Sequence, residues 1–258
     1  RIYSLAGLGT VKDNIRPFRI PHQTASLEGM CGGGVHCLCG EMSLAHNGVL
    51  FLDEAAEFRS AVLQMMRVPL ESKSICLSRA GRSTVFPTNF QLVMATNPCP
   101  CGNYGSKDKV CLCSAKSIEQ YWRKFSAPLL DRVEIKVDCN HIGFFTSDDD
   151  INLSYLRNMI KTAWEKQYER QGKLNNDLTS QEVNQYIQLT KDAEEKLNEA
   201  IEKYGYSPRE IENIKKVART IADTNESSGK VFKGKVTEIP MVNAIVLHAR
   251  TPLETMFN

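Results

Sequence analysis

The stretch Ala45-His46-Asn47-Gly48-Val49-Leu50-Phe51-Leu52-Asp53-Glu54 decides how the first part of this chain folds. Its unbroken apolar run, residues 49–52, predicts a strand buried on both faces, as in the parallel sheet of an α/β protein. Ligands of such sheets bind beyond the carboxyl ends of the strands, where Asp53 and Glu54 would lie. One carboxylate there can hold Mg²⁺ while a second acid positions an attacking water. The alternative is a buried strand followed by an ordinary acidic helix start, which the helix dipole also favours.

A second apolar segment predicts a neighbouring strand that ends at the same edge. Residues 90–96 are mostly apolar and are followed by Asn97. If the two strands are parallel neighbours, Asn97 lies beside Asp53 and Glu54, because the carboxyl ends of parallel strands share one edge. Two strands that deliver polar groups to one edge indicate a binding or active site rather than packing.

The composition is that of an ordinary globular protein. The 258 residues are 42% hydrophobic and 24% charged, which is enough for one or two domains with their own cores. No apolar stretch is long enough to cross a membrane, and the net charge of +2 does not by itself indicate nucleic-acid binding. Nine cysteines without the density of a secreted scaffold predict a cytoplasmic protein, in which they are thiols or metal ligands. Three of them are predicted to be small buried residues: Cys31, Cys76 and Cys139.

Two C-x-C pairs follow the second predicted strand and are candidate metal ligands. They are Cys99 with Cys101 and Cys111 with Cys113. Residues i and i+2 of an extended chain point to the same side, and four thiolates can form a closed tetrahedral zinc site. Zinc arms usually have the wider spacing C-x₂₋₄-C, so free loop thiols remain the alternative. A third pair, Cys37 and Cys39, is able to join the site or compete with it.

Two segments carry pairs of arginines, and the pair on a predicted hairpin is a candidate for contact with nucleic acid. Residues 75–86 predict a β-hairpin, and Arg79 and Arg82 flank its tip. Arg16 and Arg19 lie on either side of an aromatic residue in a segment with two prolines. Solvated surface charges are the alternative for the hairpin.

The chain changes character in its second half. Arg132 lies where a loop is predicted to become a strand over residues 133–137. The composition of the segment favours an ion pair between Arg132 and a neighbouring acid over contact of Arg132 with an anionic ligand. The pattern predicts an α/β domain over residues 1–147, followed by an all-α domain over residues 148–258. The predicted helices cover residues 152–171, 179–187, 190–204, 207–225 and 239–250. Arg209 lies in the first turn of one of them, where an anionic partner would offset its unfavourable interaction with the helix dipole.

Five stretches together carry a resemblance to a known family. In chain order they read RPFRIPHQTAS, GEMSLAHNGVLFLDE, ATNPCPCGNYG, LLDR and KKVARTIAD. They resemble the magnesium-chelatase-like AAA+ ATPases, and within these the ComM branch, over nearly the whole chain. The resemblance implies a partial AAA+ P-loop core, a parallel sheet with helices, followed by a small all-α lid domain. It further implies ATP and Mg²⁺ as cofactors, a homo-oligomeric ring (a hexamer) as the assembly, and DNA as a partner.

The resemblance also implies a role for each matching position. Asp53 and Glu54 match the Walker B pair, in which Asp53 serves Mg²⁺ and Glu54 polarises water. Asn97 matches the sensor-1 residue that reads the γ-phosphate. Arg132 matches the arginine finger that reaches a neighbouring subunit's nucleotide. Arg209 matches the sensor-2 arginine of the lid.

Two further segments match elements that line the central pore in this family. Arg79 and Arg82 match the pre-sensor-1 hairpin. Arg16 and Arg19 fall where this clade carries its helix-2 insert. The resemblance therefore implies that these four arginines face DNA.

The chain departs from the family pattern in ways that limit its expected activity. It begins with Arg1 and contains no G-x-x-x-x-G-K-[ST], so we expect the C-terminal part of a longer protein that does not hydrolyse ATP by itself. The expected function of the whole is ATP-driven DNA remodelling, as a branch-migrating helicase in recombination or transformation. One alternative is the motor subunit of a magnesium chelatase, which inserts magnesium into a tetrapyrrole. Another is a zinc-stabilised nucleic-acid-binding module without hydrolysis.

Overall fold

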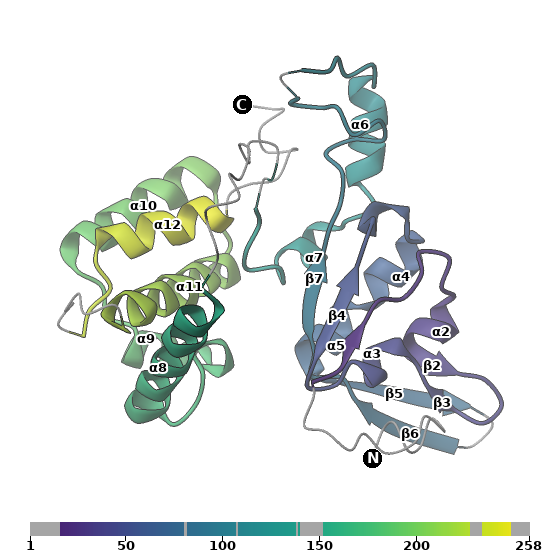
Figure 1. The fold of residues 1–258 in the computed structure, drawn as a ribbon, viewed down its shortest axis with the longest axis horizontal. Helices are drawn as coiled ribbons and strands as arrows, with labels where there is room; N and C mark the ends of the chain where they lie inside the picture. Colours follow the sequence, from purple (N-terminus) through teal and green to yellow (C-terminus); the bar gives the residue numbers. More distant parts are fainter. Residues whose placement is uncertain are drawn as a thin grey trace. The chain divides into compact units, whose positions relative to one another are not determined.

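The chain forms two compact units, Arg1–Arg132 and Val133–Asn258, in the computed structural model. The structure describes residues 16–79, 82–106, 108–137, 139, 152–227 and 234–248. Among these residues, the strands all lie in the first unit, and the second unit is helical (Figure 1). This confirms the predicted fold class, an α/β core followed by an all-α region.

A three-stranded parallel sheet organises the first unit. Its strands β1 (Phe18–Arg19), β4 (Val49–Leu52) and β7 (Gln91–Met94) lie in the order β1–β4–β7 (Figure 1). The predicted parallel pairing of the two apolar segments is confirmed, with Leu52 opposite Met94. Burial on both faces is wrong for β7, since Val93 is 38% exposed. In β4, Leu50 and Leu52 on one face are fully buried, whereas Val49 and Phe51 on the other face are half-buried, so the prediction holds there for one face only. The described part of the unit thus covers only one face of β7.

Gly48 allows the three strands to start side by side. Val49 N donates to Pro17 O (2.8 Å), and Gln91 N donates to Gly48 O (2.9 Å). A Cβ atom added to Gly48 would lie 1.9 Å from Pro17 O. Since real Cβ contacts are never that short, any side chain here would push β1 away from β4.

Short helices surround the sheet. They are α2 (Leu27–Cys31), α3 (Glu41–Leu44), α4 (Ser60–Met65), α5 (Arg67–Ser72), α6 (Ala115–Trp122) and α7 (Ala127–Leu130), with the 3₁₀ turn η1 (Ala55–Glu57). Phe58, Leu63 and Met66, in and next to α4, belong to the buried core, and each is at most 1% exposed. A small antiparallel pair, β2 (Gly32–Gly33) with β3 (Leu38–Cys39), lies beside α2 and α3 (Figure 1).

The predicted hairpin is confirmed as β5 (Ser74–Arg79) and β6 (Arg82–Pro87). Its register places Arg79 directly opposite Arg82 at the tip, while Ile75 is opposite Phe86 near the base. Both base residues are at most 9% exposed, so they anchor the hairpin on the unit. Because only residues 88–90 separate β6 from β7, the base of the hairpin joins the amino end of the sheet.

The isolated cysteines differ from one another in exposure. Cys31 is buried as predicted, but Cys76 and Cys139 are exposed, so the prediction is wrong for these two. Cys76 follows Ile75 in β5, and successive residues of a strand point to opposite faces. Ile75 takes the buried face, so the Cys76 Sγ lies on the open face, 3.3 Å from the Ser83 Oγ.

The second unit is a bundle of helices whose predicted positions are confirmed to within a few residues. They are α8 (Leu153–Gln171), α9 (Ser180–Tyr186), α10 (Lys191–Tyr204), α11 (Pro208–Ser227) and α12 (Glu238–His248), with the 3₁₀ turn η2 (Asn175–Asp177). Thr179 caps α9 in a capping box with Glu182. The core includes Ile214, Ala218 and Met241, all fully buried. None of the helices within the described ranges is both long and apolar enough to cross a bilayer.

The segment after Arg132 belongs to the second unit and forms no strand. Residues 133–137 are irregular, and Lys136 N donates to Leu247 O in α12 (2.7 Å). The predicted strand here is therefore wrong, and the backbone N–H of Lys136 bonds to the end of a helix instead of to another strand. The second compact unit starts at Val133, before the predicted domain boundary between residues 147 and 148. That boundary lies outside the described residues.

A buried ionic network stabilises the second unit. Asp223 is fully buried and accepts hydrogen bonds from Arg219 (2.7 Å) and Arg170 (2.8 Å). Burial alone would raise the pKa of Asp223, but these hydrogen bonds and charges outweigh it and hold the pKa below its ordinary value. Arg219 and Asp223 both come from the KKVARTIAD stretch, so two of its charged residues belong to the core of the unit.

Candidate functional site

The carboxyl edge of the parallel sheet brings together the polar residues that follow β4 and β7. Ala95 N donates to Leu52 O (2.9 Å), and Ala55 N donates to Ala95 O (2.8 Å). These two bonds extend the pairing of the strands past their ends. The turn that contains Asp53 therefore lies beside the segment that leads to Asn97.

The turn after β4 has an unusual backbone. Glu54 adopts φ 47° and ψ 48°, in the left-handed region that non-glycine residues rarely occupy. Such a conformation costs roughly 1–3 kcal/mol and is often found at functional sites. Glu54 N donates to the Asp53 Oδ1 (3.0 Å), which braces the turn. As a result, both acidic residues are exposed at the edge of the sheet.

Helix α6 positions the segment that carries Asn97. The Thr96 and Tyr121 hydroxyls are 3.1 Å apart, and Trp122 Nε1 donates to Pro98 O (2.9 Å). Gly102 lies close by, since a Cβ added there would be 3.9 Å from the Asn97 Oδ1. Asn97 itself is exposed, so its amide is open to a ligand at the edge. The sequence patterns did not point to the two aromatic supports, which come from a helix well beyond the strand.

The two C-x-C pairs converge on one point. Their four Sγ atoms lie within 4.8 Å of one another, with Cys99 buried and the others partly or fully exposed. Cys99 Sγ is 3.4 Å from Cys101 Sγ and 3.7 Å from Cys111 Sγ. A tetrahedral zinc ion with bonds of about 2.3 Å needs sulfurs about 3.8 Å apart. The cluster thus has the donors and spacing of a closed zinc site.

One thiol of this cluster is set apart by its hydrogen bonds. The Asn103 backbone N–H and the Cys99 thiol lower the pKa of Cys101 to about 6, so a thiolate is favoured at neutral pH. Thiolates are the form that binds metal ions. The third pair, Cys37 and Cys39, lies at β3 and does not belong to the cluster.

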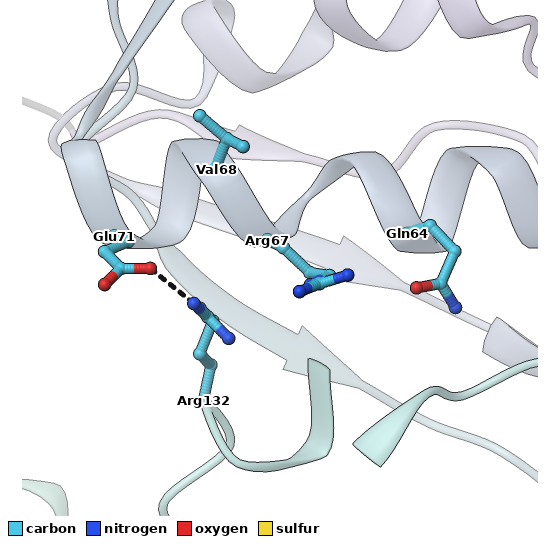
Figure 2. A pocket seen from close by; sticks show the side chains of 5 residues that line it. All are labelled: Gln64, Arg67, Val68, Glu71 and Arg132. Carbon is cyan, nitrogen blue, oxygen red and sulfur yellow. Dashed lines mark hydrogen bonds and ion pairs between the residues drawn. The ribbon is translucent and has the colours of Figure 1, made fainter. Parts of the chain in front are cut away.

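Arg132 lies in a separate pocket between α5 and the end of α7. Its guanidinium forms an ion pair with Glu71 and donates to Pro128 O, as predicted from composition. The lining residues are Gln64, Arg67, Val68, Glu71 and Arg132 (Figure 2). None of the residues at the sheet edge lines this pocket. No sequence pattern indicated Arg67 or Glu71, because both look like ordinary residues on a helix surface.

The remaining candidate arginines occupy different surroundings. Arg19 forms a two-bond ion pair with Glu41, both bonds being 2.7 Å, so its charge is already neutralised. Arg16 is exposed at the start of β1, and Arg209 is exposed in the first turn of α11. Arg79 and Arg82 occupy the tip of the hairpin, but their side chains are outside the described part. The nucleic-acid and nucleotide roles of these arginines stay predictions.

Comparisons with known proteins agree along most of the chain. Residues 1–145 match the family model of magnesium chelatase, subunit ChlI, and residues 153–238 match that of the ChlI C-terminal region. The chain is 39% identical over 236 residues to competence protein ComM of Haemophilus influenzae, covering 90% of this chain and 46% of that protein. It is 38% identical over 230 residues to the uncharacterized protein YifB of Salmonella typhimurium, covering 86% and 45%. A similar YifB protein of Escherichia coli is 40% identical over 217 residues, covering 82% and 42%. The chain thus spans just under half the length of these curated relatives.

Proposed function

Because the chain belongs to the magnesium chelatase ChlI family, we propose that it is part of a Mg²⁺-dependent AAA+ ATPase that couples ATP hydrolysis to DNA remodelling. The whole protein assembles as a homo-oligomeric ring, a hexamer, and drives branch migration in recombination or transformation. One observation carries this proposal, namely the shared sheet edge that holds Asp53, Glu54 and Asn97. The similarity to a protein named for competence supports the DNA-directed role.

The chemistry of the edge suits the cofactors that the family implies. Carboxylate and amide oxygens are ligands that Mg²⁺ accepts, and Asp53 and Asn97 offer them from neighbouring strand ends. Bound Mg²⁺-ATP would supply the reactive phosphate and neutralise part of its charge. Asp53 would hold the ion, Glu54 would orient and polarise the attacking water, and Asn97 would donate its amide to the terminal phosphate. The strained turn at Glu54 fits this role, since the side chain of Glu54 is exposed at the edge of the sheet.

Replacing Glu54 by glutamine in the full-length protein tests the catalytic part of this proposal. ATP is expected to bind as before, because the amide keeps the shape of the side chain and the Asp53 carboxylate remains. Hydrolysis is expected to fall by about 10²–10⁴-fold, the usual contribution of a general base. ATP binding and phosphate release are measured on the same preparation.

Glu57→Gln is the matched control, since Glu57 is an exposed acid in the adjacent η1 turn. It is expected to hydrolyse ATP at the parent rate. Glu54 would lose its assigned role if Glu54→Gln also kept the parent rate, or if both variants lost activity equally.

The magnesium chelatase motor is the alternative enzyme function. It predicts ATP-dependent insertion of magnesium into a tetrapyrrole, and no effect of branched DNA on ATP hydrolysis. The cysteine cluster favours the DNA-directed function, because that insert goes with the ComM branch in the resemblance. Assaying the full-length protein with a four-way DNA junction and with a tetrapyrrole distinguishes the two.

The cysteine cluster also supports a zinc-stabilised module, and we expect about one zinc ion per chain. Protein purified without chelators is analysed for metal, together with the double variant Cys99→Ser, Cys101→Ser. The double variant is expected to lose the zinc and to unfold at a lower temperature, because structural zinc contributes folding free energy directly. Cys76→Ser is the control, since Cys76 is an exposed cysteine on the hairpin. A parent protein without zinc, in which all four thiols react freely, would establish the cluster as ordinary loop thiols.

A further inference from the structure

The pocket between α5 and α7 contains two guanidinium groups. Arg67 reaches it from the start of α5 and Arg132 from the end of α7, and their side chains converge on the same opening (Figure 2). Gln64 forms one wall and is held by neighbours, since Ser126 Oγ donates to its Oε1 (2.7 Å). The pocket therefore has a fixed frame around two cations.

Both arginines carry a buried donor without an acceptor. The Nε atoms of Arg67 and Arg132 are buried and have no hydrogen-bond partner among the described residues. A buried N–H without an acceptor is destabilising, and it is more so on a charged group. Two such groups in one pocket indicate that an acceptor with negative charge belongs there.

Glu71 supplies a single carboxylate to this pair of cations. It forms an ion pair with Arg132 Nη2 and leaves the Nε of both arginines unsatisfied. The Glu71 side chain is 57% exposed, whereas that of Arg132 is 13% exposed. Glu71 can therefore turn into solvent at little cost while Arg132 stays in the pocket. The three charged groups leave one net positive charge for a ligand.

We propose that this pocket binds a phosphate group, with Arg67 as a second guanidinium beside Arg132 and Glu71 as the resident carboxylate that the phosphate displaces. Guanidinium groups bind phosphate oxygens through paired N–H donors, and a tetrahedral phosphate has enough oxygens for both arginines. Its identification as the terminal phosphate of a nucleotide on a second copy of the chain rests on the proposed function. The phosphate site itself does not depend on it.

Titration of inorganic phosphate into the chain, followed by NMR of the arginine Nε–H groups, tests the site directly. The Nε–H signals of Arg67 and Arg132, assigned from Arg67→Gln and Arg132→Gln, are expected to shift together with a Kd on the order of 1 mM. Arg67→Gln is expected to weaken phosphate binding. Glu71→Gln is expected to tighten it by about twofold to fivefold, the range for loss of an exposed ion pair.

Glu119→Gln is the matched control, because it removes the surface partner of Arg123 on α6 and leaves the pocket intact. Its phosphate affinity is expected to equal that of the parent. Since Glu71 is exposed, Glu71→Gln keeps the test valid even if an arginine variant unfolds. Absence of any Nε–H shift, or equal affinity in the parent, Arg67→Gln and Glu71→Gln, would overturn the site.

Mixed rings of the full-length protein identify the source of the phosphate. Arg67→Gln subunits and Glu54→Gln subunits are each expected to hydrolyse ATP poorly, and mixing them is expected to restore activity, because each supplies what the other lacks. If mixing restores no ATP hydrolysis while the chain still binds phosphate, the ligand is free phosphate and not the terminal phosphate of a nucleotide. If the unmodified full-length protein hydrolyses no ATP, the proposed function fails, while the titration still decides the phosphate site.

Discussion

Replacing Arg132 by alanine in the full-length protein is expected to lower ATP hydrolysis by about 10³–10⁵-fold, the range measured for arginine fingers. ATP affinity is expected to change little, because in the proposed arginine-finger role the guanidinium would act on the nucleotide of a neighbouring subunit, chiefly in the transition state. Single-turnover ATP hydrolysis and nucleotide binding, measured on assembled protein, separate the two effects.

The ion pair that holds Arg132 does not prevent this role. Its partner Glu71 is mostly exposed, and exposed ion pairs contribute only about 0–1 kcal/mol. The expected transition-state stabilisation corresponds to about 4–7 kcal/mol. Releasing Arg132 from Glu71 therefore costs much less free energy than the contact of Arg132 with the phosphate would provide in the transition state.

Arg123→Ala is the matched control for Arg132→Ala, since Arg123 pairs with Glu119 on the surface of α6 and its side chain is 72% exposed. Arg132→Lys is expected to restore little activity, because an ammonium lacks the planar fork of donors. Hydrolysis by Arg132→Ala within tenfold of the parent rate would contradict the arginine-finger role.

Reversing both charges at the hairpin tip, Arg79→Glu with Arg82→Glu, is expected to abolish DNA-stimulated ATP hydrolysis and strand movement. The net charge of +2 cannot support strong binding by one chain, because DNA affinity comes from several phosphates neutralised together. The proposed ring would repeat the hairpin in every subunit, so that the positive charges of all the hairpins would act on DNA together. We expect the charge reversal to weaken DNA binding by the assembled protein on the order of 10³-fold and to flatten its salt dependence.

Basal ATP hydrolysis is expected to survive this change. The base of the hairpin joins the amino end of β7, whereas Asp53 and Asn97 follow the carboxyl ends of their strands. Buried Ile75 and Phe86 anchor the base and are untouched by the substitutions. Arg79→Lys with Arg82→Lys keeps the charges and is expected to retain DNA stimulation. If the charge-reversed protein moves DNA as well as its parent does, the hairpin has only a structural role and does not act on DNA.

The local patterns of the sequence were sufficient to predict most of the secondary structure. An apolar run of four residues predicted β4, and a second apolar segment predicted its parallel neighbour β7. The helices of the second unit were predictable because their periodicity and caps are local, as at Thr179 with its capping box. The candidate edge residues were predictable for the same reason, since each lies within three residues of the end of a strand.

The tertiary structure alone decided which distant groups meet. The sequence could suggest an ion pair for Arg132 but could not name Glu71, which is 61 positions away and on another helix. Nor could it show that the Cys99 and Cys111 pairs fold back onto one point, that one face of β7 stays open, or that residues 133–137 bind a helix end instead of forming a strand. Caps and periodicity depend on neighbours within a few residues. Ion pairs, metal clusters and burial depend on how elements pack in space, and a single sequence does not contain that arrangement in readable form.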